Sequence, residues 1–288
     1  VLGVQSMAAN TTGNSNVAIG NSSLIAATVS DRQVGIGVEA LKNYNNTSAG
    51  DHYNVAVGYA AGRDTVDGLY NVFVGGLAGY DGDNGDNNVF VGYAAGQNNA
   101  DSNNVGIGYQ ALDANTTGGE NTAIGRDSLG SNTTADANTA LGYGSLRDNT
   151  TGSANVGLGY LALEENTTGA NNVAMGFEAL EENTTASNNT AIGYQSLSAN
   201  TTASANVAVG KRALASNTTG TNNVAVGTDA LENHTTGSDN IAVGKNVANA
   251  LTTGNTNIAI GGQAMNTNTV GDRNVAIGYS ALETYNPS

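Results

Sequence analysis

The fold is decided by a short stretch, Asn-Val-Ala-Ile-Gly at residues 16–20, which returns in related form along the whole chain. From Gly108 onward its final glycine recurs every 17 residues, whereas the earlier part contains one interval of 21 residues and one of 16. The unit reads N-V-A-I-G-Y-x-A-L-x-x-N-T-T-G-x-x, and its positions are numbered 1 to 17 below. Repetition at such a period is typical of a solenoid, in which each unit packs on its neighbours. The marker glycines are Gly20, Gly37, Gly58, Gly75, Gly92, Gly108, Gly125, Gly142, Gly159, Gly176, Gly193, Gly210, Gly227, Gly244, Gly261 and Gly278.

The first five positions alternate as a β-strand does. Position 2 is mostly Val and position 4 is Ile, Val, Leu or Met, so we expect these two positions to face the interior. Position 3 is Ala in eleven copies, Gly in three and Phe in two, and we expect it to form an outward, small-residue face that another backbone can approach. Glycine at position 5 marks a corner that needs a positive φ or has no room for a Cβ. The corner glycines of the regular region include Gly108, Gly125, Gly142, Gly159, Gly176, Gly193, Gly210 and Gly227.

The rest of the unit closes the coil. Ala-Leu at positions 8 and 9 returns the chain to the interior, and N-T-T-G contains residues that favour turns and β structure. Seventeen extended residues have a perimeter of roughly 56 Å, so the interior holds about one layer of side chains. We therefore predict an all-β, parallel β-solenoid (β-roll) of 17-residue rungs with a single-layer core, irregular over residues 1–103 and regular over residues 104–288. Stacked about 4.8 Å apart, the rungs would span on the order of 80 Å.

A fixed register stacks like residues into columns. Asparagine at position 12 is predicted to form a ladder in which each side-chain amide hydrogen-bonds to the next. The same asparagines begin N-T-T sequons, which are glycosylation candidates in a secretory pathway, although the turn already explains them. The predicted ladder comprises Asn115, Asn132, Asn149, Asn166, Asn183, Asn200 and Asn217.

Composition excludes several function classes. The net charge is −15 with only nine Lys and Arg among 288 residues, which argues against nucleic acid as a partner. The chain has no cysteine, which excludes disulfides and thiolate chemistry and fits an extracellular protein. No apolar run of about 18 residues exists, so we expect no membrane insertion. The start at Val1 shows neither an initiator Met nor a signal peptide, and we expect a processed product or a segment of something longer.

No catalytic set is apparent. His52 and His234 are the two histidines and share no rung, and we find no Ser/His/Asp set, no metal-ligand spacing and no phosphate loop. We therefore expect that the protein is not an enzyme and has no cofactor, with calcium as the one exception to test. Asp81, Asp83 and Asp86 lie in the run D-G-D-N-G-D, which resembles the start of a calcium loop but lacks the downstream bidentate Glu, so an acidic turn is the alternative.

Three variant columns are further candidates. Asp148, Glu165 and Glu182 share position 11, where either a cation bridges them or they splay into solvent. Phe73 and Phe90 replace the small residue at position 3 while nearby Ala-Leu pairs become Ala-Gly, and we expect a change of shape there, either a local variant of packing between copies or a receptor contact. Tyrosines follow the corner at position 6, where packing over rung edges competes with sugar binding, at Tyr93, Tyr109, Tyr143, Tyr160 and Tyr194.

The repeat, clearest from Asn104 to Leu282, resembles the repeats of phage tail-fibre and related surface-fibre proteins, including those that end in an endosialidase-type intramolecular chaperone. Its N-V-A-I-G core also resembles the head repeats of trimeric autotransporter (YadA-like) adhesins, although the rungs of that head are shorter. The resemblance implies a left-handed parallel β-roll assembled as a homotrimer and used for attachment. Trimerisation would also bury the outward small-residue face, and closed symmetry satisfies three equal faces.

We therefore expect a structural fibre or adhesin shaft that forms a rigid extracellular, cell-surface or virion projection. Its partners would be further copies of itself and a cell-surface glycan or protein receptor. Two alternatives remain. A self-assembling extracellular filament or sheath would join protomers end to end through bare strand edges, and an ice-binding solenoid would use the paired threonines of consecutive rungs, a column that fails between Asn54 and Asn104.

Overall fold

The computed structural model describes residues 2–48 and 50–283, which form strands, bends and turns and no helix. No helix that could cross a membrane therefore occurs in these residues. The chain divides into two compact units, Val1–Leu141 and Gly142–Ser288. Both the 21-residue and the 16-residue intervals lie in the first unit, so the boundary between the units falls inside the region of regular repeats.

The strands are short and evenly spaced. The first unit contains β1 (Val17–Ile19), β2 (Ser30–Asp31), β3 (Val34–Ile36), β4 (Gly50–Asp51), β5 (Val55–Val57), β6 (Val72–Val74), β7 (Val89–Val91), β8 (Val105–Ile107), β9 (Thr122–Ile124) and β10 (Thr139–Leu141). The second contains β11 (Val156–Leu158), β12 (Val173–Met175), β13 (Thr190–Ile192), β14 (Val207–Val209), β15 (Val224–Val226), β16 (Ile241–Val243), β17 (Ile258–Ile260) and β18 (Val275–Ile277).

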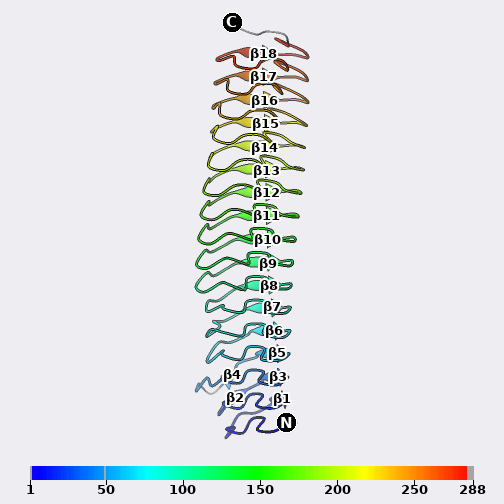
Figure 1. The fold of residues 1–288 in the computed structure, drawn as a ribbon. Helices are drawn as coiled ribbons and strands as arrows, with labels where there is room; N and C mark the ends of the chain where they lie inside the picture. The colour runs from blue at the N-terminus through cyan, green and yellow to red at the C-terminus, as the bar shows by residue number, and fades with distance from the viewer. Residues whose placement is uncertain (1, 49, 284–288) are drawn as a thin grey trace. The chain divides into compact units, whose positions relative to one another are not determined.

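Within each unit the strands at positions 2 to 4 stack into one parallel sheet, one strand per rung (Figure 1). Equivalent residues pair, so that Val173 of β12 lies opposite Thr190 of β13. Equivalent residues stay paired across the two irregular intervals. Val34 of β3 pairs with Val55 of β5 across the 21-residue interval, and Val89 of β7 pairs with Val105 of β8 across the 16-residue interval. The 21-residue rung also adds a small parallel sheet of β2 and β4. Each unit is thus a parallel β-solenoid built on a 17-residue repeat, as the sequence predicted.

The predicted inside and outside of the strand are wrong. The middle residue, position 3, is buried in every strand of the main sheet, with Ala140 and Ala174 fully enclosed, whereas positions 2 and 4 are half-buried or exposed. The reason is the size of the interior. Leu at position 9 fills it from the other side of the coil, and a Cβ built on Gly35 would lie 3.2 Å from Cγ of Leu24. Only a small side chain fits opposite that leucine.

Phe73 and Phe90, which were expected to mark a packing variant between copies or a receptor contact, lie in the core. Both phenylalanines are fully buried and stack with their ring centroids 6.0 Å apart. Leu at position 9 is replaced by glycine in these rungs, and a Cβ on Gly79 would lie 2.5 Å from the Phe73 ring. The large residue has moved from one side of the core to the other, so the substitutions refill the interior of the coil and place neither phenylalanine on a surface.

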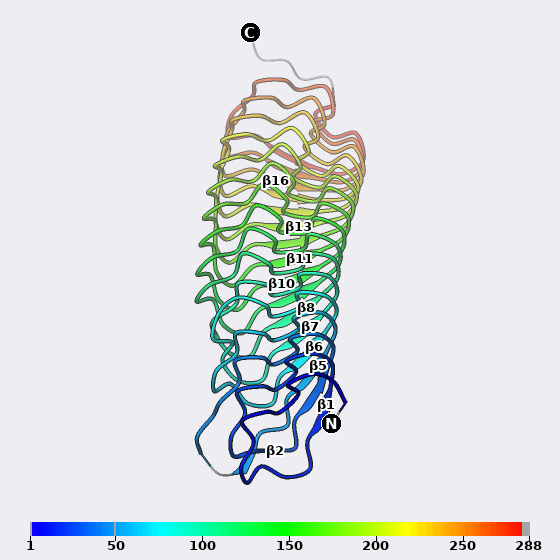
Figure 2. The ribbon, with the colours of Figure 1, turned by 60° about the horizontal axis from the view of Figure 1, so that its bottom comes forward.

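Tight corners let the coil close (Figure 2). The Gly108 and Gly176 corners both have φ near +140°, and a Cβ on Gly176 would lie 2.4 Å from the carbonyl oxygen of Gly193 in the next rung. A side chain is therefore excluded by both conformation and space. Positions 7, 9 and 17 also take positive φ, mostly without glycine, as Gln110 (51°), Leu112 (58°) and Glu120 (61°) show. The repeat gave no signal for this left-handed backbone.

Candidate functional site

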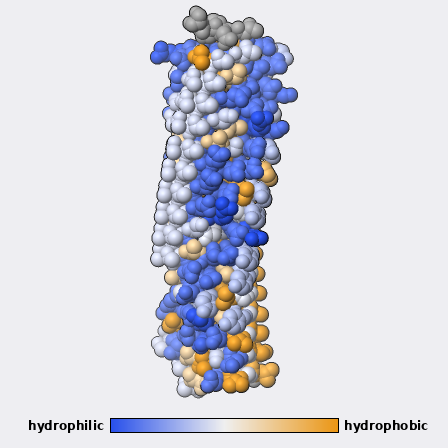
Figure 3. Space-filling view, viewed as in Figure 1, coloured by the Kyte–Doolittle hydropathy of each residue, from blue (hydrophilic) through white to orange (hydrophobic). Residues whose placement is uncertain are grey.

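The sheet face carries partly exposed apolar side chains in each unit. Its outward side chains at positions 2 and 4 are half-buried or exposed, and the exposed ones range from 36% for Val74 and Val226 to 67% for Ile277 in β18. Hydrophobic side chains gather along one edge of the first unit in the space-filling view (Figure 3). Large exposed apolar patches are a feature of protein interaction sites in general. Because the face repeats with every rung, it offers mainly Val, Ile and Thr at regular intervals, with Leu141, Leu158 and Met175 as the exceptions.

Aromatic side chains at position 6 stack into columns beside the corners. Tyr143, Tyr160, Phe177 and Tyr194 form a continuous stack in the second unit, with centroids 5.1–5.4 Å apart and planes within 12° of parallel. Tyr93 and Tyr109 form a shorter stack in the first unit. These rings cover one another's faces and expose mainly their edges. Since sugars stack on ring faces, the arrangement favours packing over sugar binding at these tyrosines.

Asparagines at position 12 form hydrogen-bonded ladders inside each unit. Asn132 Nδ2 donates to Asn115 Oδ1 (2.8 Å) in the first unit, and Asn166 Nδ2 donates to Asn149 Oδ1 (2.7 Å) in the second. The second ladder continues through Asn183, Asn200 and Asn217. Each amide also donates to the carbonyl of position 15, as Asn166 does to Gly169 (2.9 Å). These side chains are fully buried, so the folded protein presents none of the seven sequon asparagines for glycosylation.

The ladder of the second unit is interrupted after Asn217. His234 and Leu251 take position 12 in the next two rungs, and both are fully buried. Asn217 Oδ1 and Asn268 Nδ2, on either side of the interruption, consequently lack hydrogen-bond partners within the part of the chain that the structure describes. Both ring nitrogens of His234 face carbonyl oxygens, those of Gly237 (2.8 Å) and Leu251 (3.2 Å). Burial lowers the pKa of His234 despite these two acceptors.

Two further columns form hydrogen-bond networks: the asparagines at position 1, whose stacking the repeat predicts, and the residues at position 16, which the sequence analysis missed. At position 1, each buried asparagine accepts the backbone N–H of the next position 1, as Asn54 Oδ1 does from Asn71 (2.8 Å). At position 16, Asp, Ser and Asn side chains accept the N–H of position 16 in the preceding rung, as Asp136 does from Gly119 (2.8 Å) and Ser187 from Ala170 (3.0 Å). The recurrence of small hydrogen-bonding residues at position 16 was the available signal.

Carboxylates of the predicted acidic turn accept hydrogen bonds from backbone N–H groups. Asp83 Oδ1 accepts from the N–H of Val66 (2.7 Å), and Asp86 Oδ1 accepts from the N–H of Leu69 (2.8 Å), both in the preceding rung. The backbone N–H of Asp81 donates to the carbonyl of Gln97 (2.6 Å). Across residues 2–48 and 50–283, no group of three or more His, Cys, Asp or Glu side chains is arranged to hold a metal ion. The geometry therefore favours the acidic turn, and calcium at these three residues remains an untested prediction.

Carboxylates also crowd one side of the second unit. Of the predicted position-11 column, Glu165 and Glu182 are exposed, so these two splay into solvent. At position 10, Glu164 is nearly buried and pairs with Arg147. Burial, reinforced by the neighbouring carboxylates of Glu178 and Glu164, raises the pKa of Glu181 to about 7.

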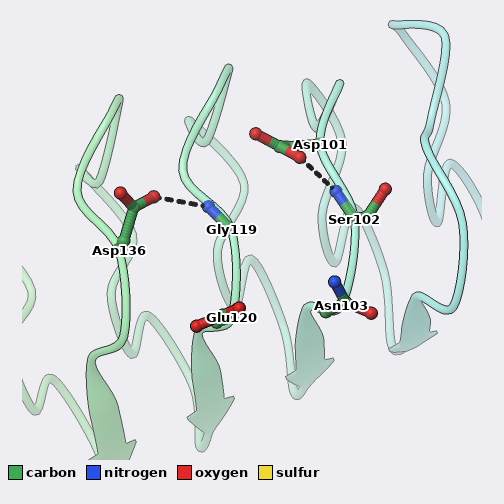
Figure 4. A pocket seen from close by; sticks show the side chains of 6 residues that line it. All are labelled: Asp101, Ser102, Asn103, Gly119, Glu120 and Asp136. Carbon is green, nitrogen blue, oxygen red and sulfur yellow. Dashed lines mark hydrogen bonds between the residues drawn. The ribbon is translucent and has the colours of Figure 1, made fainter.

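A polar pocket of about 290 Å³ opens in the first unit where the 16-residue interval shortens a turn (Figure 4). Asp101, Glu120 and Asp136 bring carboxylates to its wall. Two of these already serve the backbone, because Asp101 Oδ1 accepts from Ser102 N–H (2.7 Å) and Asp136 Oδ1 accepts from Gly119 N–H. Glu120 is exposed. The pocket is therefore an acidic notch without a buried, unpaired group.

Together, the coil and its internal columns define the chain as a β-solenoid repeat protein. Comparison with models of protein families, with curated proteins and with solved structures found no match in any of the three.

Proposed function

We propose that the protein is a non-catalytic structural segment of an extracellular, cell-surface or virion fibre, whose copies associate through the outward sheet face. The observation that carries this proposal is the column of partly exposed Val, Ile, Leu and Met at positions 2 and 4, which only Thr122, Thr139 and Thr190 interrupt at position 2. Exposed side chains such as Ile192 and Val243 bury apolar surface only if something covers them. A homotrimer of left-handed coils with these faces turned inward is the assembly proposed.

The proposed contact lies on the side of the strand opposite to the small-residue face that was first expected. The side chain at position 3 is buried in the core of each unit, so it cannot contact another copy. Positions 2 and 4 replace it, with a stronger physical motive, because β-branched side chains bury more apolar area than alanine. Attachment to a glycan or protein receptor belongs to the same proposal and would fall to turns or to further parts of the fibre.

Light scattering on the purified protein tests the assembly. The wild-type mass should match three protomers, and the double substitution Val226→Lys and Val243→Lys should shift it toward one, because both side chains lie on the face and point outward. Thr219→Lys and Thr236→Lys, in exposed turns of the same region, form the matched control and should leave the mass unchanged. A wild-type monomer would overturn the proposal, and a mass that grows with concentration would favour an end-to-end filament.

The threonine columns favour ice binding as a second candidate. Position 14 is an exposed threonine in seven consecutive rungs of the second unit, and position 13 is held rigid, since Thr167 Oγ1 donates to the carbonyl of Thr184 (2.9 Å). Such a regular hydroxyl array is able to order water. Thermal hysteresis that is lost in the Thr219→Lys and Thr236→Lys control would support this function, and freezing behaviour equal to that of a buffer would rule it out. The exposed column is Thr151, Thr168, Thr185, Thr202, Thr219, Thr236 and Thr253.

A further inference from the structure

Two columns of side chains border the sheet face, one at each end of its strands. Position 17 comes just before position 1, where the strand segment begins, and position 6 comes just after the corner glycine, where it ends. Charged residues in these columns are exposed, as Glu120 and Asp239 are at position 17 and Arg126 and Lys245 are at position 6. Any partner that covers the sheet face therefore also meets its two borders.

The two borders differ in charge. The chain has 24 acidic residues, yet none of them occurs at position 6, and only Glu120 and Asp239 occur at position 17. Position 6 holds three of the nine basic residues, which are Arg126, Lys211 and Lys245. The position-6 border is thus free of the negative charge that dominates the chain.

Both acidic border residues lie beside a strand whose other end is basic. Glu120 and Arg126 flank β9, and Asp239 and Lys245 flank β16. Six extended residues span about 20 Å, so these charges are too far apart to pair across their own strand. Arg126 pairs with its neighbour Asp127 (3.1 Å), and a guanidinium has five N–H donors to share among carboxylates. Within the part of the chain that the structure describes, neither Asp239 nor Lys245 has an ion-pair partner.

A closed trimer would bring opposite borders of neighbouring copies together. Rotation about an axis along the stacked rungs keeps every residue at its own height. The contacts of such a ring are head to tail, so the position-6 border of one copy meets the position-17 border of the next. At equal height, Arg126 of one copy faces Glu120 of the next, and Lys245 faces Asp239.

We propose that Arg126 with Glu120, and Lys245 with Asp239, form ion pairs between copies that fix their alignment in the fibre. This inference rests on the proposed association through the sheet face and adds what sets the register of that association. The apolar face supplies the affinity, whereas complementary charges at an interface mainly select the correct alignment.

The repeat makes such a device necessary. Because the sheet face offers similar side chains at every rung, copies displaced by one rung would bury nearly the same apolar surface. That displacement would set both cations against uncharged residues and would lose every one of the proposed pairs. The uncharged residues are Asn103 and Ala137 for Arg126, and Asn222 and Thr256 for Lys245.

Charge reversal at Asp239 and Lys245 tests the proposal. Asp239→Lys should raise the dissociation constant of the trimer about tenfold, because each trimer contains this contact three times. General charge repulsion predicts the opposite, since the substitution makes the chain less negative. Asp239→Lys combined with Lys245→Asp should restore association to the wild-type level.

The matched control is Asp239→Lys combined with Lys211→Asp, which has the same net charge as the restored variant. Lys211 lies at position 6 two rungs away from Lys245, so this control should remain weakened. Equal recovery in the two double variants, or tighter association in Asp239→Lys than in the wild type, would overturn the proposal.

Carbodiimide crosslinking of the wild-type protein provides a second measurement that does not require the trimer to dissociate. The reagent activates the Asp239 carboxylate, and the Lys245 amine then forms an amide with it and releases the reagent as a urea. Mass spectrometry should find this amide in the multimer bands of a denaturing gel. It should be absent from Lys245→Arg, which keeps the charge but has no amine.

The crosslinking result also separates this inference from the proposed function. A trimer whose multimer bands lack the amide between Lys245 and Asp239 would overturn the ion pairs and leave the association through the sheet face standing. A wild-type monomer would overturn both.

Discussion

At the scale of single residues, the left-handed backbone is the least expected property of the repeat. Positions 7, 9 and 17 take positive φ with ordinary side chains, and a Cβ in that region costs about 1–2 kcal/mol per residue. Leu112 tolerates φ of 58° because its side chain is fully buried in the core. An exposed residue such as Ala137, also at φ of 58°, gains nothing comparable from its side chain.

Ala137→Gly should therefore stabilise the protein. Relief of the left-handed strain outweighs the extra flexibility of glycine in the unfolded chain, and we expect a gain of roughly 0.5–1 kcal/mol in the free energy of unfolding. Ala100→Gly is the control, since Ala100 is exposed and has no positive φ, and it should destabilise by a similar amount. Urea denaturation measures both, and a loss of stability in Ala137→Gly would contradict the argument.

His234 should make the protein sensitive to mild acid. Its folded pKa is lowered by burial, so below pH of about 6.5 the unfolded chain binds a proton that the folded state resists. The stability that the neutral ring contributes is present above that pH and is lost as the pH falls toward the folded pKa. The free energy of unfolding at pH 7.5 and 5.5 should differ less in His234→Asn than in the wild type, and an unchanged difference would refute this role.

Repair of the ladder is a separate prediction at the same site. The double substitution His234→Asn and Leu251→Asn places amides where Asn217 Oδ1 and Asn268 Nδ2 lack partners. We expect the free energy of unfolding at pH 7.5 to rise by about 1–3 kcal/mol, as when buried polar groups become satisfied. Leu251→Asn alone is the control and should gain less, because the histidine still interrupts the column. Denaturant unfolding of the three proteins measures the difference.

At the scale of the rung, the side chains at positions 3 and 9 fill the interior from opposite sides of the coil, so the size of one limits the size of the other. In most rungs a small residue at position 3 accompanies Leu at position 9, whereas Phe73 and Phe90 each accompany glycine. Gly62, in the rung of Ala56, leaves room for the Phe73 ring of the next rung, 2.5 Å from where its Cβ would lie. A Cβ on Gly96 would lie 2.5 Å from three atoms of the Phe90 ring. The large side chain that fills the interior is therefore supplied from either side of the coil, at position 9 in most rungs and at position 3 by Phe73 and Phe90.

This rule predicts strong coupling between Phe90 and Gly96. Gly96→Leu alone should clash with the ring, and Phe90→Ala alone should cost about 3–5 kcal/mol through the cavity left behind. The double variant recreates a regular rung and should recover much of both losses, with a coupling energy of at least 1–3 kcal/mol in a double-mutant cycle. Phe90→Ala combined with Leu24→Ala, several rungs away, should be additive, and additivity in the first pair would refute the rule.

At the scale of the whole molecule, net charge opposes the proposed association. A chain with a charge of −15 repels its own copies, whereas the sheet face that would hold them together is apolar. The balance depends on salt, because the screening length falls from about 30 Å at 0.01 M to about 8 Å at 0.15 M ionic strength.

Added salt should therefore strengthen association at neutral pH. In light scattering at a fixed protein concentration, the mass should rise or stay saturated as sodium chloride is increased from about 0.01 M to 0.15 M. Val226→Lys with Val243→Lys, which interrupts the apolar face, should show little response. A mass that falls with salt would mean that ion pairs hold the copies together, contrary to the proposed apolar contact.

The sequence alone was sufficient for the repeat period, the strand at positions 2 to 4, the parallel stacking and the glycine corner, because each depends on local pattern or on register. It also indicated where like side chains would stack, including the asparagines at position 12. The position-16 ladder was missed although small hydrogen-bonding residues recur there. The left-handed residues were not anticipated, because the ordinary side chains at positions 7, 9 and 17 do not by themselves favour a positive φ.

Only the tertiary structure decided which side of the strand is the inside. A period of two residues establishes that Val17 and Ile19 face opposite to Ala18, yet the alternation is the same whichever set points inward. The choice was made by the width of the closed coil, where Leu at position 9 leaves room for only a methyl group across from it. That width comes from turns at positive φ, which belong to the folded rung as a whole, and it turned the β-branched residues outward to form the face on which the proposed function rests.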